Sequence, residues 1–135
     1  MLAGLILAGA NLDPTRDPDR DDGVLTATEV SSLDLSACRV AVLSACQTSL
    51  GLRRSGEGLQ SLRRGFHEAG ARSVVASLWK VDDAATQQLM HAFYEELWTN
   101  GCGAGEALRR AKQALKREGK GPEAWGAFTL SGEWR

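Results

Sequence analysis

Cys46 is the side chain in this sequence best placed to act as a nucleophile. It follows an apolar, β-rich run at 39–45 (RVAVLSA), at the point where a predicted strand should end. In open α/β sheets, reacting groups gather at the carboxyl ends of strands, because loops there can carry function while the sheet holds them rigid. A glycine-rich, partly basic segment follows at 47–58 (QTSLGLRRSGEG), and such a setting favours a lowered thiol pKa. The ordinary alternative is a small buried cysteine that fills space in the core.

Three acidic residues near predicted strand ends, Glu57, Asp82 and Asp83, are candidates for contact with a basic side chain of a substrate. Helix capping is the simpler explanation for Asp82 and Asp83. At a helix start, the negative charge of Glu57 would be stabilised by the positive end of the helix dipole. The sequence contains two histidines, His67 and His91, and both fall inside predicted helices. We therefore do not predict either of them as a general base, which must come within hydrogen-bond reach of the sulfur.

The elements that would position these side chains alternate between strands and helices. Apolar residues at 59, 62, 66 and 69 predict an amphipathic helix that ends at Gly70. Because a helix of this length joins two strands, the strands should be parallel. A threonine followed by glutamate three residues later predicts a short capped helix. The predicted segments are a strand at 2–8, a surface loop at 11–23, a helix at 26–33, strands at 39–45 and 73–79, helices from 82 or 83 to about 100 and from 105 to 118, and a strand at 126–131.

Composition narrows the functional class. The chain has 135 residues, a size that suits a single domain, and its 43% hydrophobic and 24% charged residues are typical of a packed globular protein. A formal net charge of −1 indicates neither a nucleic-acid partner nor a membrane surface. Three cysteines without a CxxC pair indicate neither a disulfide framework nor a zinc site. We expect a cytoplasmic protein without a metal or cofactor.

Several motifs occur together in one order: SACQT, GEG, FHEAGARSVVASLWKVDDAAT and AWGAFTLSG, preceded by LAGLILAGAN and DGVLTATEV. Together they resemble the CHAT domain, a caspase-like module often attached to tetratricopeptide repeats. The resemblance covers nearly the whole chain, from Leu2 to Gly132.

The resemblance implies a three-layer α/β/α caspase-like sandwich with a mainly parallel sheet. It assigns Cys46 to the nucleophile position and a peptide or protein as the substrate. In that family the catalytic histidine belongs to a His-Gly motif on the neighbouring strand, upstream of the segment that resembles 2–10. That histidine is absent from the sequence, so we expect residues 1–135 to form a single partial domain, truncated on its N-terminal side and inactive as a cysteine endopeptidase by itself.

Two alternatives remain open. The chain could be a non-catalytic interaction module, or a remnant of a larger tetratricopeptide-repeat protein, because the missing strand would leave 39–45 with an open edge. Another chain or a tetratricopeptide-repeat region would then be the partner that supplies the missing strands. A thiol redox sensor that uses Cys38 and Cys46 is the weaker alternative, because no resolving pair is apparent.

Overall fold

The computed structural model describes residues 4–8, 10, 22–44 and 55–135 of the chain. Cys46, Arg53 and Arg54, and most of the predicted loop at 11–23, lie outside the described residues. The elements, in chain order, are β1 (Gly4–Ile6), β2 (Val24–Thr26), α1 (Ala27–Ser31), β3 (Val40–Leu43), α2 (Ser55–Glu68), β4 (Ser73–Ser77), α3 (Asp83–Tyr94), the π-helix η1 (Glu95–Thr99), α4 (Ala104–Arg117), α5 (Pro122–Trp125) and β5 (Phe128–Gly132).

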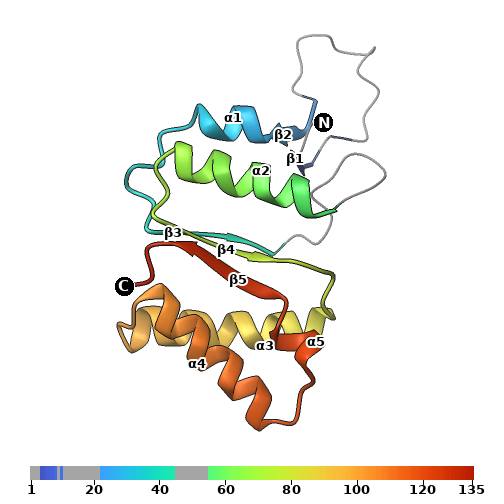
Figure 1. The fold of residues 1–135 in the computed structure, drawn as a ribbon, viewed down its shortest axis with the longest axis vertical. Helices are drawn as coiled ribbons and strands as arrows, with labels where there is room; N and C mark the ends of the chain where they lie inside the picture. The colour runs from blue at the N-terminus through green and yellow to red at the C-terminus, as the bar shows by residue number, and fades with distance from the viewer. Residues whose placement is uncertain (1–3, 9, 11–21, 45–54) are drawn as a thin grey trace.

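Helices cover both faces of a three-stranded sheet whose strand order is β3-β4-β5 (Figure 1). Helices α1 and α2 lie on one face, and α3, α4 and α5 lie on the other. Strands β1 and β2 form a separate antiparallel pair next to α1 and α2. The predicted α/β class is confirmed, and the helices on both faces give three layers.

The prediction of a mainly parallel sheet is wrong for the described strands. Strands β3 and β4 are parallel, with Val40 opposite Ser73, as the strand-helix-strand pattern predicted. Strands β4 and β5 are antiparallel, with Ser77 opposite Phe128. The physical reason is the number of helices between the strands. A single helix, α2, returns the chain to the amino end of the sheet, whereas α3 and α4 together bring it back to the carboxyl end, where β5 begins.

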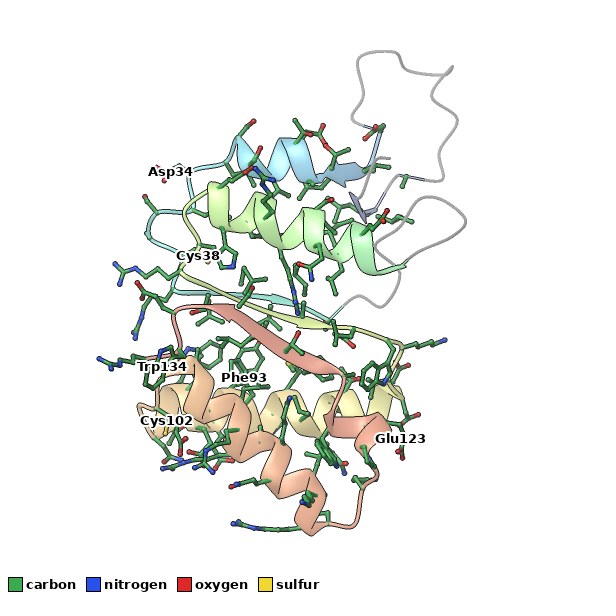
Figure 2. All side chains as sticks on the ribbon, in the orientation of Figure 1. Asp34, Cys38, Phe93, Cys102, Glu123 and Trp134 are labelled. Atoms are coloured by element: carbon green, nitrogen blue, oxygen red, sulfur yellow. The ribbon has the colours of Figure 1, made fainter. Side chains whose placement is uncertain are left out.

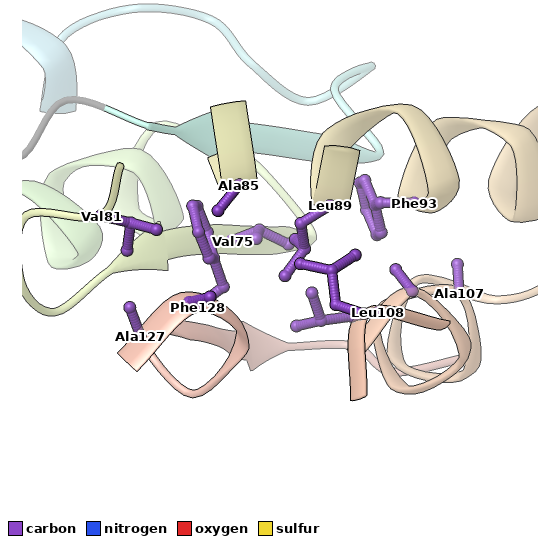
Figure 3. Close-up of a cluster of buried hydrophobic side chains, with 12 residues drawn as sticks. Val75, Val81, Ala85, Leu89, Phe93, Ala107, Leu108, Ala127 and Phe128 are labelled. Atoms are coloured by element: carbon purple, nitrogen blue, oxygen red, sulfur yellow. The ribbon is translucent and has the colours of Figure 1, made fainter. Parts of the chain in front are cut away.

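Strand β4 is the centre of the structure, because all five of its residues are buried. Side chains alternate along a strand, so neighbouring residues enter different cores. Val75 packs into the cluster formed with α3, α4 and α5, which includes Phe93 and Phe128 (Figure 3). Val74 and Ala76 pack into the opposite cluster with residues of α1 and α2. One short strand therefore contributes to both hydrophobic cores.

Local signals fix the ends of several helices where the sequence predicted them. The Thr26 hydroxyl accepts a hydrogen bond from the Glu29 backbone N–H at 3.2 Å, and the Thr26 backbone N–H donates to the Glu29 carboxylate at 2.7 Å, which completes a capping box. Gly70 follows α2 with a φ of 107°, a conformation that a glycine adopts without strain. Its missing Cβ also matters, because that atom would lie 2.9 Å from the backbone nitrogen of Ser36.

Strand β3 is less buried than the continuous apolar run at 39–45 would suggest. Val40, Ala41 and Val42 are only half-buried, and Leu43 alone is buried. The reason is position: among the described strands, β3 pairs only with β4 and lies at the edge of the sheet. This arrangement agrees with the predicted open edge at 39–45.

The two-core packing predicts a large difference between buried and exposed aromatic side chains. Phe93 is fully buried, so Phe93→Ala should lower the free energy of unfolding by about 3–5 kcal/mol. Trp98 is 73% exposed and stacks on Tyr94, so Trp98→Ala should cost no more than about 1.5 kcal/mol. Urea unfolding of the three proteins measures both values. Equal losses for the two variants would contradict the described core.

Candidate functional site

The candidate site lies at the carboxyl ends of β3 and β4. In the parallel register, Leu43 lies opposite Ala76, so both strands end at the same rim of the sheet. The chain leaves β3 through the exposed Ser44, two residues before Cys46 in the sequence. Helices α2 and α3 begin at this same end of the sheet. The connection from β3 to α2, which contains Cys46, therefore starts and ends at this rim.

Two large side chains after β4, Leu78 and Trp79, are exposed at this rim by 44% and 43%. The segment is held in place by backbone and side-chain contacts with the α5 region. The Leu78 N–H donates to the Ala127 carbonyl at 2.9 Å, and the Trp79 indole N–H donates to the Glu123 carbonyl at 3.0 Å. Trp79 thus packs at the rim with its indole N–H hydrogen-bonded. Its ring lies 3.7 Å from the position that a Cβ on Gly126 would occupy.

The structure gives Asp82 a capping role. Its carboxylate accepts hydrogen bonds from the backbone N–H groups of Ala84 at 3.1 Å and Ala85 at 3.2 Å, so it is the N-cap of α3. Asp83 is the exposed first residue of α3, and Glu57 is exposed in the first turn of α2. Carboxylates at these positions are stabilised by the positive ends of the helix dipoles. All three predicted acids belong to helix starts at the rim.

Neither histidine lies at the rim. The His67 Nδ1 lies 3.0 Å from the Ala71 carbonyl oxygen, and its Nε2 lies 3.0 Å from the Ser131 Oγ. A carbonyl can only accept, so Nδ1 donates to it. Ala71 precedes the amino end of β4, so His67 is at the end of the sheet opposite the rim. His91 is exposed on α3. Both side chains therefore have positions unsuited to a base for a thiol at the rim.

The described thiols, Cys38 and Cys102, also lie away from the rim. Both are unpaired and half-buried, and Figure 2 shows them toward the amino end of β3, with Glu123 at the opposite end. Burial raises the pKa of the Cys102 thiol, and its hydrogen bond to the Glu96 carboxylate at 3.4 Å raises that pKa further. A raised pKa leaves less thiolate, so Cys102 is a poor nucleophile.

A groove of about 590 Å³ runs beneath the open edge of β3. Apolar side chains from β3 and η1 form its walls, and they include Val40, Val42, Leu97 and Trp98. Arg39, Arg72 and Arg135 also line it, together with Glu133. None of the sequence motifs predicted this groove. The spacing of Tyr94 and Trp98, four residues apart, was the available signal, since such residues share one face of a helix.

The described residues contain neither a metal-binding cluster nor a membrane-spanning helix. They contain no group of three His, Cys, Asp or Glu side chains that could hold a metal ion. Within the same part of the chain, no helix combines the length and the hydropathy that crossing a bilayer requires.

The chain is similar to a known domain family and to short parts of two larger proteins. A model of the CHAT domain matches residues 2–133. Tetratricopeptide repeat protein 28 of Mus musculus is 38% identical over 111 residues, and the protein of the same name from Homo sapiens is 35% identical over 117 residues. These matches cover 81% and 85% of this chain, but only 4% and 5% of the two relatives.

The geometry of Asp82 predicts that its stabilising effect comes from hydrogen-bond acceptance. Asp82→Ala should lower the free energy of unfolding by about 1 kcal/mol, because two N–H groups at the start of α3 lose their acceptor. Asp82→Asn keeps an acceptor and should cost no more than about 0.5 kcal/mol. Thermal or urea unfolding measures both variants. If the asparagine variant were as unstable as the alanine variant, the cap would not be the source of the effect.

Proposed function

Because the chain belongs to the CHAT domain family, we propose that it is the nucleophile-bearing part of a caspase-like cysteine endopeptidase domain, with Cys46 as the attacking group. One observation supports this most directly. The parallel strands β3 and β4 end at one rim, and Cys46 follows β3 by three residues in the sequence. Carboxyl-end rims of parallel strands are where α/β proteins place reacting groups.

A cysteine endopeptidase also needs a base, and we propose that a histidine from outside this sequence supplies it. His67 is engaged at the opposite end of the sheet, and His91 is exposed on α3. A thiol without a base keeps a pKa near about 8.5 and is mostly protonated at neutral pH. The chain by itself should therefore be inactive or very slow in peptide hydrolysis, as expected from its sequence.

The open edge of β3 supports this proposal, because a histidine-bearing strand could pair there. Such a strand could come from another part of a longer polypeptide or from a second chain. The matched relatives are tetratricopeptide repeat proteins of which this chain spans about one twentieth, so a tetratricopeptide-repeat region is a further candidate partner. Exposed backbone groups on an edge strand provide the hydrogen bonds for such pairing.

In the completed site, the histidine would take the proton of the Cys46 thiol, and the sulfur would form a bond to the peptide carbonyl carbon. Backbone N–H groups would stabilise the resulting oxyanion. The C–N bond would then break as the histidinium protonates the leaving amine, and water would hydrolyse the thioester to regenerate the thiol. Glu57, Asp82 and Asp83 would lie near the substrate and favour a basic side chain. The unpaired thiols of Cys38 and Cys102 support a reducing, cytoplasmic location.

The second candidate function is a non-catalytic interaction module within a larger tetratricopeptide-repeat protein. The groove beneath β3 favours it, because Trp98 is 73% exposed there beside the half-buried Val40 and Val42. Exposed tryptophan in an apolar groove is typical of interaction surfaces. In this case the open edge would bind a partner strand that carries no base, and Cys46 would have no chemical role.

Selective alkylation tests whether Cys46 is an accessible and reactive thiol in the isolated chain. An electrophilic peptide probe should label Cys46 faster than Cys102, because burial and the Glu96 carboxylate raise the pKa of the Cys102 thiol. Mass spectrometry of the labelled chain measures each site, with Cys46→Ala as the blank and Cys38→Ser and Cys102→Ser as matched controls. Labelling of Cys46 that is no faster than that of Cys102 would count against the peptidase proposal, because Cys46 would then be less reactive than an ordinary accessible thiol.

Self-association of the purified chain tests the open edge of β3. We expect dimers or larger species by light scattering, because the open edge of β3 and the apolar groove beneath it can bind a second copy of the chain. Trp98→Glu should weaken this association at least about fivefold by placing a charge on the apolar surface, while changing the free energy of unfolding by no more than about 1.5 kcal/mol. A monomeric wild-type chain at high concentration would remove the support that the edge gives to both candidate functions.

A further inference from the structure

Arg63 is a buried charge that the proposed peptidase site does not use. It lies on α2 with only 8% of its surface exposed, facing β4 and β5. One terminal nitrogen, Nη2, lies within hydrogen-bond distance of the Ala76 carbonyl at 3.4 Å and the Thr129 carbonyl at 3.3 Å, and it also contacts the Thr129 hydroxyl. All three partners are neutral oxygen atoms.

The positive charge of Arg63 is not balanced by any acid in the described part of the chain. No carboxylate of the described residues lies within ion-pair distance of its guanidinium, and its buried Nε has no hydrogen-bond partner there. Burial lowers the pKa of the group, but a guanidinium remains protonated in proteins. A buried charge without a counterion is costly, and arginines in such positions usually pair with an anion.

Arg63 lines an open groove of about 450 Å³ between α2 and β5. The other lining residues are Gln60, Arg64, His67, Glu68 and Ser131. Gln60 and Arg64 carry N–H donors, whereas the Ser131 hydroxyl lies 3.0 Å from the His67 Nε2 and donates to it. The carboxylate, Glu68, is already engaged by Arg64 at 2.7 Å. The groove therefore combines two guanidiniums and an amide with a hydroxyl and an imidazole that are paired with each other and a carboxylate that is paired with Arg64.

We propose that this groove binds a phosphoryl group, with the buried Arg63 as its principal cation. A phosphoryl group has up to two negative charges, which match the two guanidiniums of the groove better than the single charge of a carboxylate does. Arg64 would add its positive charge while it remains paired with Glu68, and Gln60 would add a neutral hydrogen bond. The site is separate from the rim that leads to Cys46, because His67 and Ser131 place one end of it at the opposite end of the sheet.

The same chemistry could come from a free phosphate compound or from a phosphorylated side chain of a protein. Both present a tetrahedral oxoanion to the groove, but a peptide would also contact residues around it. Inorganic phosphate and a phosphoserine peptide therefore serve as separate probes, with the unphosphorylated peptide as the blank for the second.

Calorimetric titration of the 135-residue chain at constant ionic strength tests the site. Phosphate should bind, and Arg63→Met should weaken binding at least about tenfold, since the principal positive charge of the groove is lost. Arg64→Gln should weaken it about twofold to fivefold, because its side chain is 79% exposed. Arg109→Gln, on the exposed face of α4, is the matched control and should bind as the wild type does. Tighter binding of the phosphoserine peptide than of phosphate would identify a protein source, and equal or weaker binding a free one.

A measurement without substitution covers the case in which Arg63→Met fails to fold. Phosphate should shift the NMR signal of the Arg63 Nε–H group, and the same concentration of chloride should not. If the signal does not move and phosphate gives no heat beyond that of chloride, the proposal is wrong. It is also wrong if Arg63→Met folds and binds phosphate as tightly as the wild type, which would leave Arg63 as a tie between α2 and the sheet.

Discussion

Strand β4 is buried along its whole length, and this burial organises the rest of the molecule. Since its side chains alternate, Val75 packs among α3, α4 and α5, and Val74 and Ala76 pack among residues of α1 and α2. Both helical layers are thereby fixed to one strand. Strand β3 takes its position from its pairing with β4, so the rim at which β3 ends, and the helix starts around it, are consequences of how β4 is buried.

Within the described residues, the rim is held by hydrogen bonds, whereas the edge of β3 has no second partner strand. At the rim, Asp82 caps α3, and Trp79 is hydrogen-bonded to the α5 region. Along the edge, β3 has one partner strand, and apolar side chains, including the highly exposed Trp98, line the groove beneath it. Reactivity of a cysteine depends on the groups beside it, so under the proposed function the chemistry of Cys46 would depend on what pairs with β3.

Two kinds of interaction hold α2 on the sheet. Apolar residues of α2, such as Leu59 and Leu62, hold the helix on the sheet through burial. Arg63 is also buried beneath the same helix, where its hydrogen bonds tie α2 to β4 and β5, yet its charge lacks a carboxylate partner among the described residues. Burial of an uncompensated charge opposes folding, so its presence in this layer calls for an explanation beyond packing.

The amino-acid sequence by itself determined the elements that depend on near neighbours. The apolar spacing of α2, the capping box at Thr26 and the stop at Gly70 are local, and so is the single-helix crossover that makes β3 and β4 parallel. The short helix α5 was missed, although a proline after Gly121 is a known start signal. Only the tertiary structure decided the direction of β5, the half-burial of β3 and the surroundings of Arg63. These depend on contacts between segments far apart in the chain, such as Arg63 with Thr129, 66 residues away, which no local pattern encodes.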